Sequence, residues 1–119
     1  MSVQVNKKFN SIDDGINNML DAAAHDYSKG GYTHRTSDDF RNNFMHKVGQ
    51  KYIKIGRKSD YNGKMGQVWC FVVNTDDDAK FKRGDILKSE GFNAPARNAP
   101  RGNVLDGGFN IQWTGPLYL

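Results

Sequence analysis

The sequence predicts an α+β fold: two N-terminal helices packed on a 3-4-stranded antiparallel sheet, with a long irregular C-terminal loop. Between residues 12 and 27, apolar side chains recur at spacings of three and four, which is the period of a helix. After residue 50 this period is lost, and short alternating or wholly apolar segments follow, separated by turn residues. Because 119 residues suffice for one compact core, we expect a single domain, helical over 11–49 and formed of sheet and loop over 50–119.

The first helix is expected to run from Ser11 to about Lys29. Ser11 precedes the apolar stripe as an N-cap residue, and Asp14 follows three positions later, as in a capping box with a shorter carboxylate. The glycines at 30–31 supply the left-handed backbone that often ends a helix. A linker over 32–35 is expected to follow.

A second helix is expected to begin after Thr36 or Ser37 and to end at Gly49. Both candidate caps can accept a hydrogen bond from the first turn, and two aspartates follow them near the positive end of the helix. The apolar stripe of this helix would consist of Phe40, Phe44 and Val48.

Two strands joined by a turn form the clearest part of the predicted sheet. The segment KYIKIGRK, residues 51–58, alternates apolar and polar positions, which is typical of a half-buried strand. The segment from Val68 to Val73 is apolar throughout, which indicates a central strand covered on both faces. Asn62-Gly63 between them is a turn signal, so we expect the two strands to pair antiparallel.

Both faces of the second strand need a cover. A regular alternation assigns its residues to two faces: Trp69, Phe71 and Val73 on one, Val68, Cys70 and Val72 on the other. The helices would cover one face. The other would be covered by the long loop or by an identical subunit, so a homo-oligomer is possible.

The remaining sequence predicts two further strands and the loop. KFKRGDILK, residues 80–88, is expected to form a third strand interrupted at Gly84, and residues 109–113 alternate as a closing strand would. Residues 91–108 are rich in Gly, Asn and Pro and fit no regular element. Because long loops of this kind in compact domains are often functional, this loop is the main candidate for a binding site.

Composition excludes several classes of protein. A content of 37% hydrophobic and 12% aromatic residues is too high for an intrinsically disordered chain. No apolar run approaches the roughly 18 residues of a membrane helix, and MSVQVNKKFN lacks the apolar middle of a signal peptide. A single cysteine, Cys70, allows no internal disulfide and fits a reducing compartment. We therefore expect a soluble, cytoplasmic protein with no membrane partner.

The sequence favours neither catalysis nor metal binding. His25, His34 and His46 lack the spacing of zinc ligands, and the acidic triple at 76–78 lacks the ligand pattern of a calcium loop. No serine has a nucleophile motif around it, and Cys70 lies mid-strand, where burial makes a thiol inert. We therefore expect a non-enzymatic binding protein without metal or cofactor.

The net charge of +4 lies entirely in the second half of the chain, where two groups of basic and polar residues stand out. The first lies in and beside the irregular loop, where guanidinium, amide and backbone groups could hold a phosphate-bearing small ligand. Its members are Lys88, Asn93, Arg97, Asn98, Arg101 and Asn103. The alternative is that the Asn, Gly and Pro residues only form turns and that the arginines are solvated or paired with acids.

The second group lies on the first predicted strand, close in sequence to two tyrosines. It consists of Lys51, Lys54, Arg57 and Lys58. Lysines and arginines beside aromatic rings can bind single-stranded nucleic acid through phosphate attraction and base stacking. The alternative is that a solvent-facing edge strand carries lysines to prevent aggregation.

Four segments resemble the C-terminal pattern of small accessory proteins of tailed bacteriophages: VWCFV, GDILK, NAPARNAPRGNV and WTGPLYL, within residues 50–119. Gly91-Phe92 stands where that pattern has Ser-Trp, and the motifs carry no assigned chemistry. The resemblance implies a phage protein acting in the cytoplasm of the infected bacterium. Such proteins often neutralise a host component, including nucleotide signals of antiviral defence. An inhibitor of a host enzyme, or a minor virion component, is a further class to consider.

Overall fold

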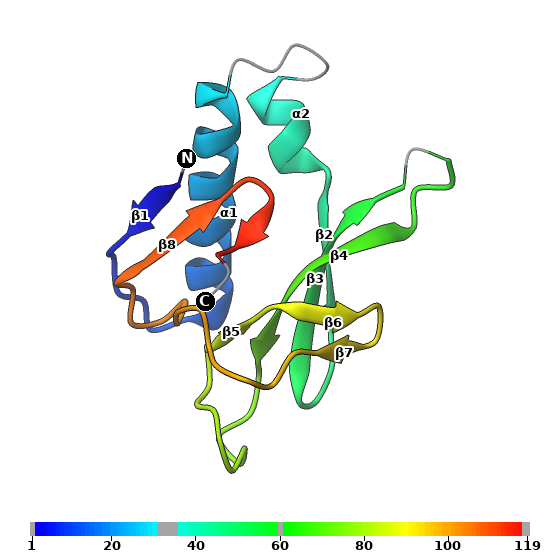
Figure 1. The fold of residues 1–119 in the computed structure, drawn as a ribbon. Helices are drawn as coiled ribbons and strands as arrows, with labels where there is room; N and C mark the ends of the chain where they lie inside the picture. Colours follow the sequence, from blue (N-terminus) through cyan, green and yellow to red (C-terminus); the bar gives the residue numbers. More distant parts are fainter. Residues whose placement is uncertain (1, 31–35, 60, 118–119) are drawn as a thin grey trace.

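The computed structural model describes residues 2–30, 36–59 and 61–117, and it confirms the α+β class. The predicted single sheet is wrong in detail, because the described strands form three sheets of orders β1-β8-β9, β2-β3-β4-β5 and β6-β7 (Figure 1). The elements are β1 (Val3–Val5), α1 (Ile12–Lys29), α2 (Ser37–Asn42), β2 (Phe44–Val48), β3 (Tyr52–Lys58), β4 (Met65–Val73), β5 (Ile86–Leu87), β6 (Ser89–Gly91), β7 (Ala94–Pro95), β8 (Phe109–Gln112) and β9 (Gly115–Pro116).

Helix α1 confirms the predicted first helix. The side chain of Ser11 caps it by accepting a hydrogen bond from the backbone N–H of Asp14 at 3.4 Å. The predicted left-handed ending is wrong at Gly30, which has a right-handed φ of −76° and donates its N–H to the carbonyl of Tyr27. Gly31 and the predicted linker at 32–35 lie outside the described residues.

The predicted second helix is only half correct. Thr36 caps α2 in a reciprocal capping box with Asp39, but the helix ends at Asn42, and residues 44–48 form β2. Phe44 to Val48 fits both the period of a helix and the period of a strand. Pairing with β3 decides for the strand, because β2 then satisfies the backbone groups along one edge of β3.

Strands β3 and β4 pair antiparallel, as predicted, and a bulge between them changes which residues share a face. Ile55 pairs with Cys70 and Gly56 pairs with Val68, so Trp69 is an extra residue in β4. Trp69 therefore joins the α1 side of the sheet, with Cys70 and Val72, and the predicted grouping of Trp69 with Phe71 is wrong.

The main core lies between α1 and this face of the sheet. Cys70 is fully buried there, which raises the pKa of its thiol and keeps it protonated and unreactive, as the sequence indicated. Strand β8 confirms the closing strand over Phe109 to Gln112, but it pairs with β1 and β9 beside α1 rather than with the main sheet (Figure 1).

The opposite face of the four-stranded sheet, called the outer face below, carries a smaller apolar cluster. Phe71, Val73, Leu87 and Phe81 are buried there, with Tyr52 packed against them. Phe81 belongs to the loop after β4 rather than to a strand, because the predicted third strand is reduced to β5. The long loop itself contains the β6–β7 hairpin, which crosses in front of β3 and β4 in Figure 1.

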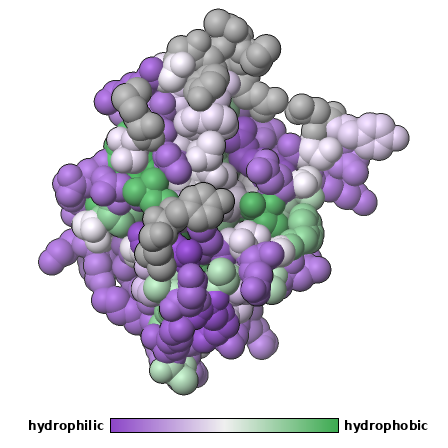
Figure 2. Space-filling model, viewed as in Figure 1, coloured by the Kyte–Doolittle hydropathy of each residue, from purple (hydrophilic) through white to green (hydrophobic). Residues whose placement is uncertain are grey.

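The surface seen in Figure 2 is mostly hydrophilic, with small separate apolar areas. None of the helices in the described part of the chain combines the length and the apolar character needed to cross a membrane.

Candidate functional site

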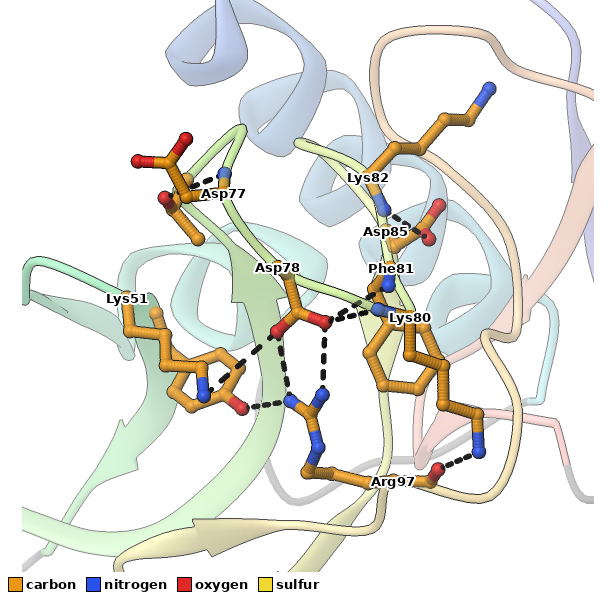
Figure 3. A network of polar contacts seen from close by, with 10 residues as sticks. Lys51, Asp77, Asp78, Lys80, Phe81, Lys82, Asp85 and Arg97 are labelled. Carbon is orange, nitrogen blue, oxygen red and sulfur yellow. Dashed lines mark hydrogen bonds and ion pairs between the residues drawn. The ribbon is translucent and has the colours of Figure 1, made fainter.

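Arg97 of the predicted loop site forms an ion pair with a buried carboxylate. Its guanidinium donates to both oxygens of Asp78 at 2.9 and 3.0 Å, hydrogen-bonds the hydroxyl of Tyr52, and lies 4.8 Å from the ring centre of Phe81 (Figure 3). The side chain of Asp78 is 1% exposed. Arg97 and the backbone N–H groups of Lys80 and Phe81 hold the pKa of that carboxyl well below its ordinary value.

Asn103 is likewise engaged within the fold. Its amide donates to the carbonyl of Arg83 at 2.9 Å and to the carboxylate of Asp85 at 3.0 Å. Its side-chain oxygen accepts from the backbone N–H groups of Leu105 and Asp106 at 2.8 and 3.1 Å. The side chain is buried and bridges two loop segments, so its role here is structural.

Of the other four residues of the predicted site, Arg101 lies near both Asn98 and Lys88, whereas Asn93 lies beside β3. Arg101 bonds to Asn98 at 2.9 Å and to a backbone carbonyl of its own loop. The Lys88 ammonium donates to the carbonyl of Pro116 at 2.8 Å, and burial together with the charge of Arg101 lowers its pKa. Asn93 accepts a hydrogen bond from Lys54 at 3.0 Å.

Two members of the predicted loop site, Arg97 and Asn103, are therefore held by partners within the fold. Arg97 and Asn103 fit the alternative in which turn residues and acid-paired arginines stabilise the loop. Lys88 lies close enough to Arg101 for the two charges to interact, whereas Asn93 belongs to the surroundings of β3.

Strand β3 divides the second predicted group between its two faces. Arg57 lies on the α1 side, where its guanidinium stacks 3.9 Å from the ring centre of Phe40 and donates to Asn43 at 2.9 Å. Lys54 lies on the outer face in the same row as Phe71, and Lys58 is exposed at the end of the strand. The predicted basic residues therefore do not all lie on one face of the sheet.

A lysine that the sequence analysis missed completes the outer face. Lys47 of β2 pairs directly opposite Lys54, so the two ammonium groups share a face. A helix over 44–48, as the sequence predicts, does not place Lys47 opposite Lys54; strand β2 does. The signal that would have found it is the Gly49-Gln50 dipeptide, a turn signal directly before the predicted strand at 51–58.

The edge-strand explanation does not account for Lys54. Strand β3 lies between β2 and β4, so it is an inner strand with both neighbours paired. Like charges directly opposite each other destabilise a sheet. An anion lying between Lys47 and Lys54 would relieve this repulsion.

Two adjoining hollows open on the outer face. The basic hollow, of about 260 Å³, is lined by Lys47, Val48, Gly49, Lys51, Tyr52, Lys54 and Phe71. The polar hollow, of about 470 Å³, is lined by Gln50, Lys51, Thr75, Asp77, Asp78, Ala79 and Arg97. Lys51 lines both hollows; its ammonium lies 5.6 Å from the ring centre of Tyr52 and forms an ion pair with the Asp78 carboxylate at 3.9 Å (Figure 3).

An exposed aromatic ring stands beside the basic hollow. Phe92, in the turn between β6 and β7, is 50% exposed. The Lys54 ammonium lies 4.3 Å from the centre of its ring and also bonds to the neighbouring Asn93. Lys54 therefore ties the hairpin to the outer face and covers one face of the ring, which stays half exposed.

No protein-family model matches the chain, and searches of curated proteins and of solved structures also found no match.

Proposed function

We propose that the protein is a non-enzymatic module that binds single-stranded nucleic acid on the outer face of its four-stranded sheet. The observation that carries the proposal is the basic hollow. Its lining, all within the described residues, contains three lysines and no acidic side chain, over a floor that includes Tyr52 and Phe71, and of the three only Lys51 has an acidic partner in the described part of the chain, Asp78 of the adjoining hollow. Phosphates would lie against Lys47, Lys51 and Lys54, and a base would stack on Phe92.

The openness of the surface favours a strand over an enclosed small ligand. Lys47, Val48, Gly49 and Lys51 are all exposed, so a polymer can pass through the hollow. Successive phosphates of a nucleic-acid strand can contact Lys47, Lys51 and Lys54 separately. A single phosphate can contact only some of these lysines. Each phosphate neutralised by a lysine adds to the affinity through counterion release.

The phosphate-bearing small ligand at the irregular loop stays a prediction. To bind it through the predicted residues, Arg97 would have to leave Asp78, and Asn103 would have to leave a bridge in which both its amide and its oxygen are used. A phage origin, action in an infected bacterial cytoplasm, a host-protein target and a homo-oligomer also stay predictions.

The proposal is tested by fluorescence anisotropy with labelled oligo(dT) and oligo(U) at several salt concentrations. Affinity should fall steeply as salt rises, and Lys54→Gln should reduce the slope of log K against log salt by about 0.7. The matched control is Lys8→Gln, which removes the same charge from an exposed position beyond β1.

Three results would overturn the proposal. The oligonucleotides could fail to bind, Lys8→Gln could weaken binding as much as Lys54→Gln does, or a mononucleotide could bind as tightly as the oligomers. The third result would instead favour the small-ligand hypothesis.

A further inference from the structure

Three charged side chains meet where the two hollows adjoin: Lys51, Asp78 and Arg97 (Figure 3). Arg97 donates to both oxygens of the Asp78 carboxylate at 2.9 and 3.0 Å, whereas the Lys51 ammonium lies 3.9 Å from one of these oxygens. The side chain of Asp78 is buried, and the side chain of Lys51 is 57% exposed. The carboxylate therefore has a close partner in Arg97 and a more distant one in Lys51.

The balance of charge in this group leaves one cation in excess. Asp78 carries one negative charge, and two positive charges face it. Because the guanidinium of Arg97 binds the carboxylate through two hydrogen bonds, it neutralises most of that charge. The backbone N–H groups of Lys80 and Phe81 donate to the same carboxylate at 2.8 and 3.0 Å. The Lys51 ammonium therefore stays available to an anion in the basic hollow.

Arg97 also contacts the floor of the basic hollow. Its guanidinium hydrogen-bonds the hydroxyl of Tyr52, and the ring of Tyr52 packs against Phe71 with 5.9 Å between ring centres. A residue of the irregular loop is thereby joined to two residues of the basic hollow, directly to Tyr52 and through Asp78 to Lys51. Arg97 can therefore influence binding on the outer face without touching the ligand.

We propose that Arg97 is a positioning residue for the binding of single strands, because its pairing with Asp78 keeps Lys51 available to a phosphate. Without the guanidinium, Lys51 is the cation left in the described ion pairs of a buried carboxylate. Their attraction draws the ammonium away from the basic hollow. The strand then loses one of its three lysine contacts although Lys51 itself is unchanged. This inference rests on the proposed binding of single strands to the outer face.

The test measures the anisotropy of labelled oligo(dT) at several salt concentrations. In the wild-type background, Lys51→Gln should reduce the slope of log K against log salt by about 0.7. Arg97→Gln should reduce the slope by the same amount, and Lys51→Gln added to it should bring no further reduction. Arg97→Lys keeps a cation beside Asp78 and should retain the wild-type slope. Arg83→Gln is the matched control, because it removes the same charge from an exposed pair with Asp76 and should leave the slope unchanged.

The double variant Arg97→Gln/Asp78→Asn separates this role from a loss of stability. It lacks the carboxylate that attracts Lys51, so the wild-type slope should return. A defect caused by disturbed packing would persist, because the ion pair between loop and turn is still absent. This variant leaves no buried carboxylate unpaired, so it carries the test even if Arg97→Gln alone is too unstable to fold.

The inference fails on any of three results. Arg97→Gln could keep the full slope, Lys51→Gln could cause a further reduction in its presence, or Arg97→Gln/Asp78→Asn could keep the reduced slope. Each of these results leaves the proposed function standing if oligo(dT) binds the wild type and Lys54→Gln weakens that binding. Absence of binding by the wild type overturns both proposals.

Discussion

The outer face of the sheet and the irregular loop both carry cations, and they differ in what those cations contact. In the loop, Arg97 binds the buried carboxylate of Asp78 through two hydrogen bonds. On the outer face, Lys54 contacts the neutral groups of Asn93 and Phe92 and lies opposite another lysine. An arginine that is already neutralised contributes to stability, whereas lysines with neutral or like-charged neighbours can still attract an anion.

Asp78→Ala tests whether Arg97 stabilises the loop by binding the Asp78 carboxylate. Removal of the buried carboxylate leaves Arg97 and two backbone N–H groups without their acceptor, so we expect the largest drop in Tm from this change. Asp76→Ala, in an exposed pair, is the control and should change Tm little. Equal Tm values for the two variants would contradict a structural role for Arg97.

The same carboxylate predicts how stability depends on pH. Its pKa in the folded protein is lower than in the unfolded chain, where an aspartate has a pKa of about 3.9. The stabilisation is therefore complete above that value and is lost as the pH falls below it. Denaturant unfolding between pH 7 and pH 3 should show a smaller acid loss in Asp78→Asn than in the wild type, and an unchanged loss would contradict this assignment.

Asn103→Ala examines the second structural residue of the loop. The change leaves the N–H groups of Leu105 and Asp106 without their acceptor, so the free energy of unfolding should fall by about 2 kcal/mol. The control, Asn98→Ala, removes an exposed amide and should have a much smaller effect. Affinity for oligo(dT) should stay unchanged in both variants. A binding defect confined to Asn103→Ala would show that the loop takes part in binding.

On the outer face, Phe92→Ala should weaken oligo(dT) binding about tenfold through loss of one stacked base. Tm should change little, because the ring is half exposed and lies in a turn. Phe92→Tyr keeps an aromatic ring and should retain wild-type affinity. The stacking role is wrong if Phe92→Ala binds as tightly as Phe92→Tyr.

The smallest expected effect comes from the opposed lysines. Lys47→Gln removes their repulsion, so the free energy of unfolding at low salt should rise by about 0.5 kcal/mol, and the gain should shrink as salt screens the charges. The same variant should bind oligo(dT) with a salt slope reduced by about 0.7. A variant that is destabilised, or whose binding is unchanged, would show that Lys47 has another role.

Local sequence patterns correctly predicted the elements that are determined by residues close together in the sequence. Helix α1 has its cap and its apolar stripe within one segment, and the β3–β4 hairpin has its alternation and turn within another. Residues 44–48 were assigned to the wrong element because their pattern fits both periods, and the choice depends on β3. The face of Trp69 was wrong because one extra residue in a strand reverses the alternation.

The candidate site was only partly predictable for the same reason. Lys51 and Lys54 were found from their spacing beside an aromatic residue. Lys47 could not be found without the correct strand, and the engagement of Arg97 depends on Asp78 and on Tyr52, which is 45 positions away in the chain.

The sequence by itself determined the α+β class, the first helix, the central hairpin and the inert core cysteine, because periodicity, caps and turns act over a few residues. Only the tertiary structure decided which cations meet carboxylates and which stay open to solvent. Charges attract or repel through space, so their roles depend on neighbours that distant segments bring to them.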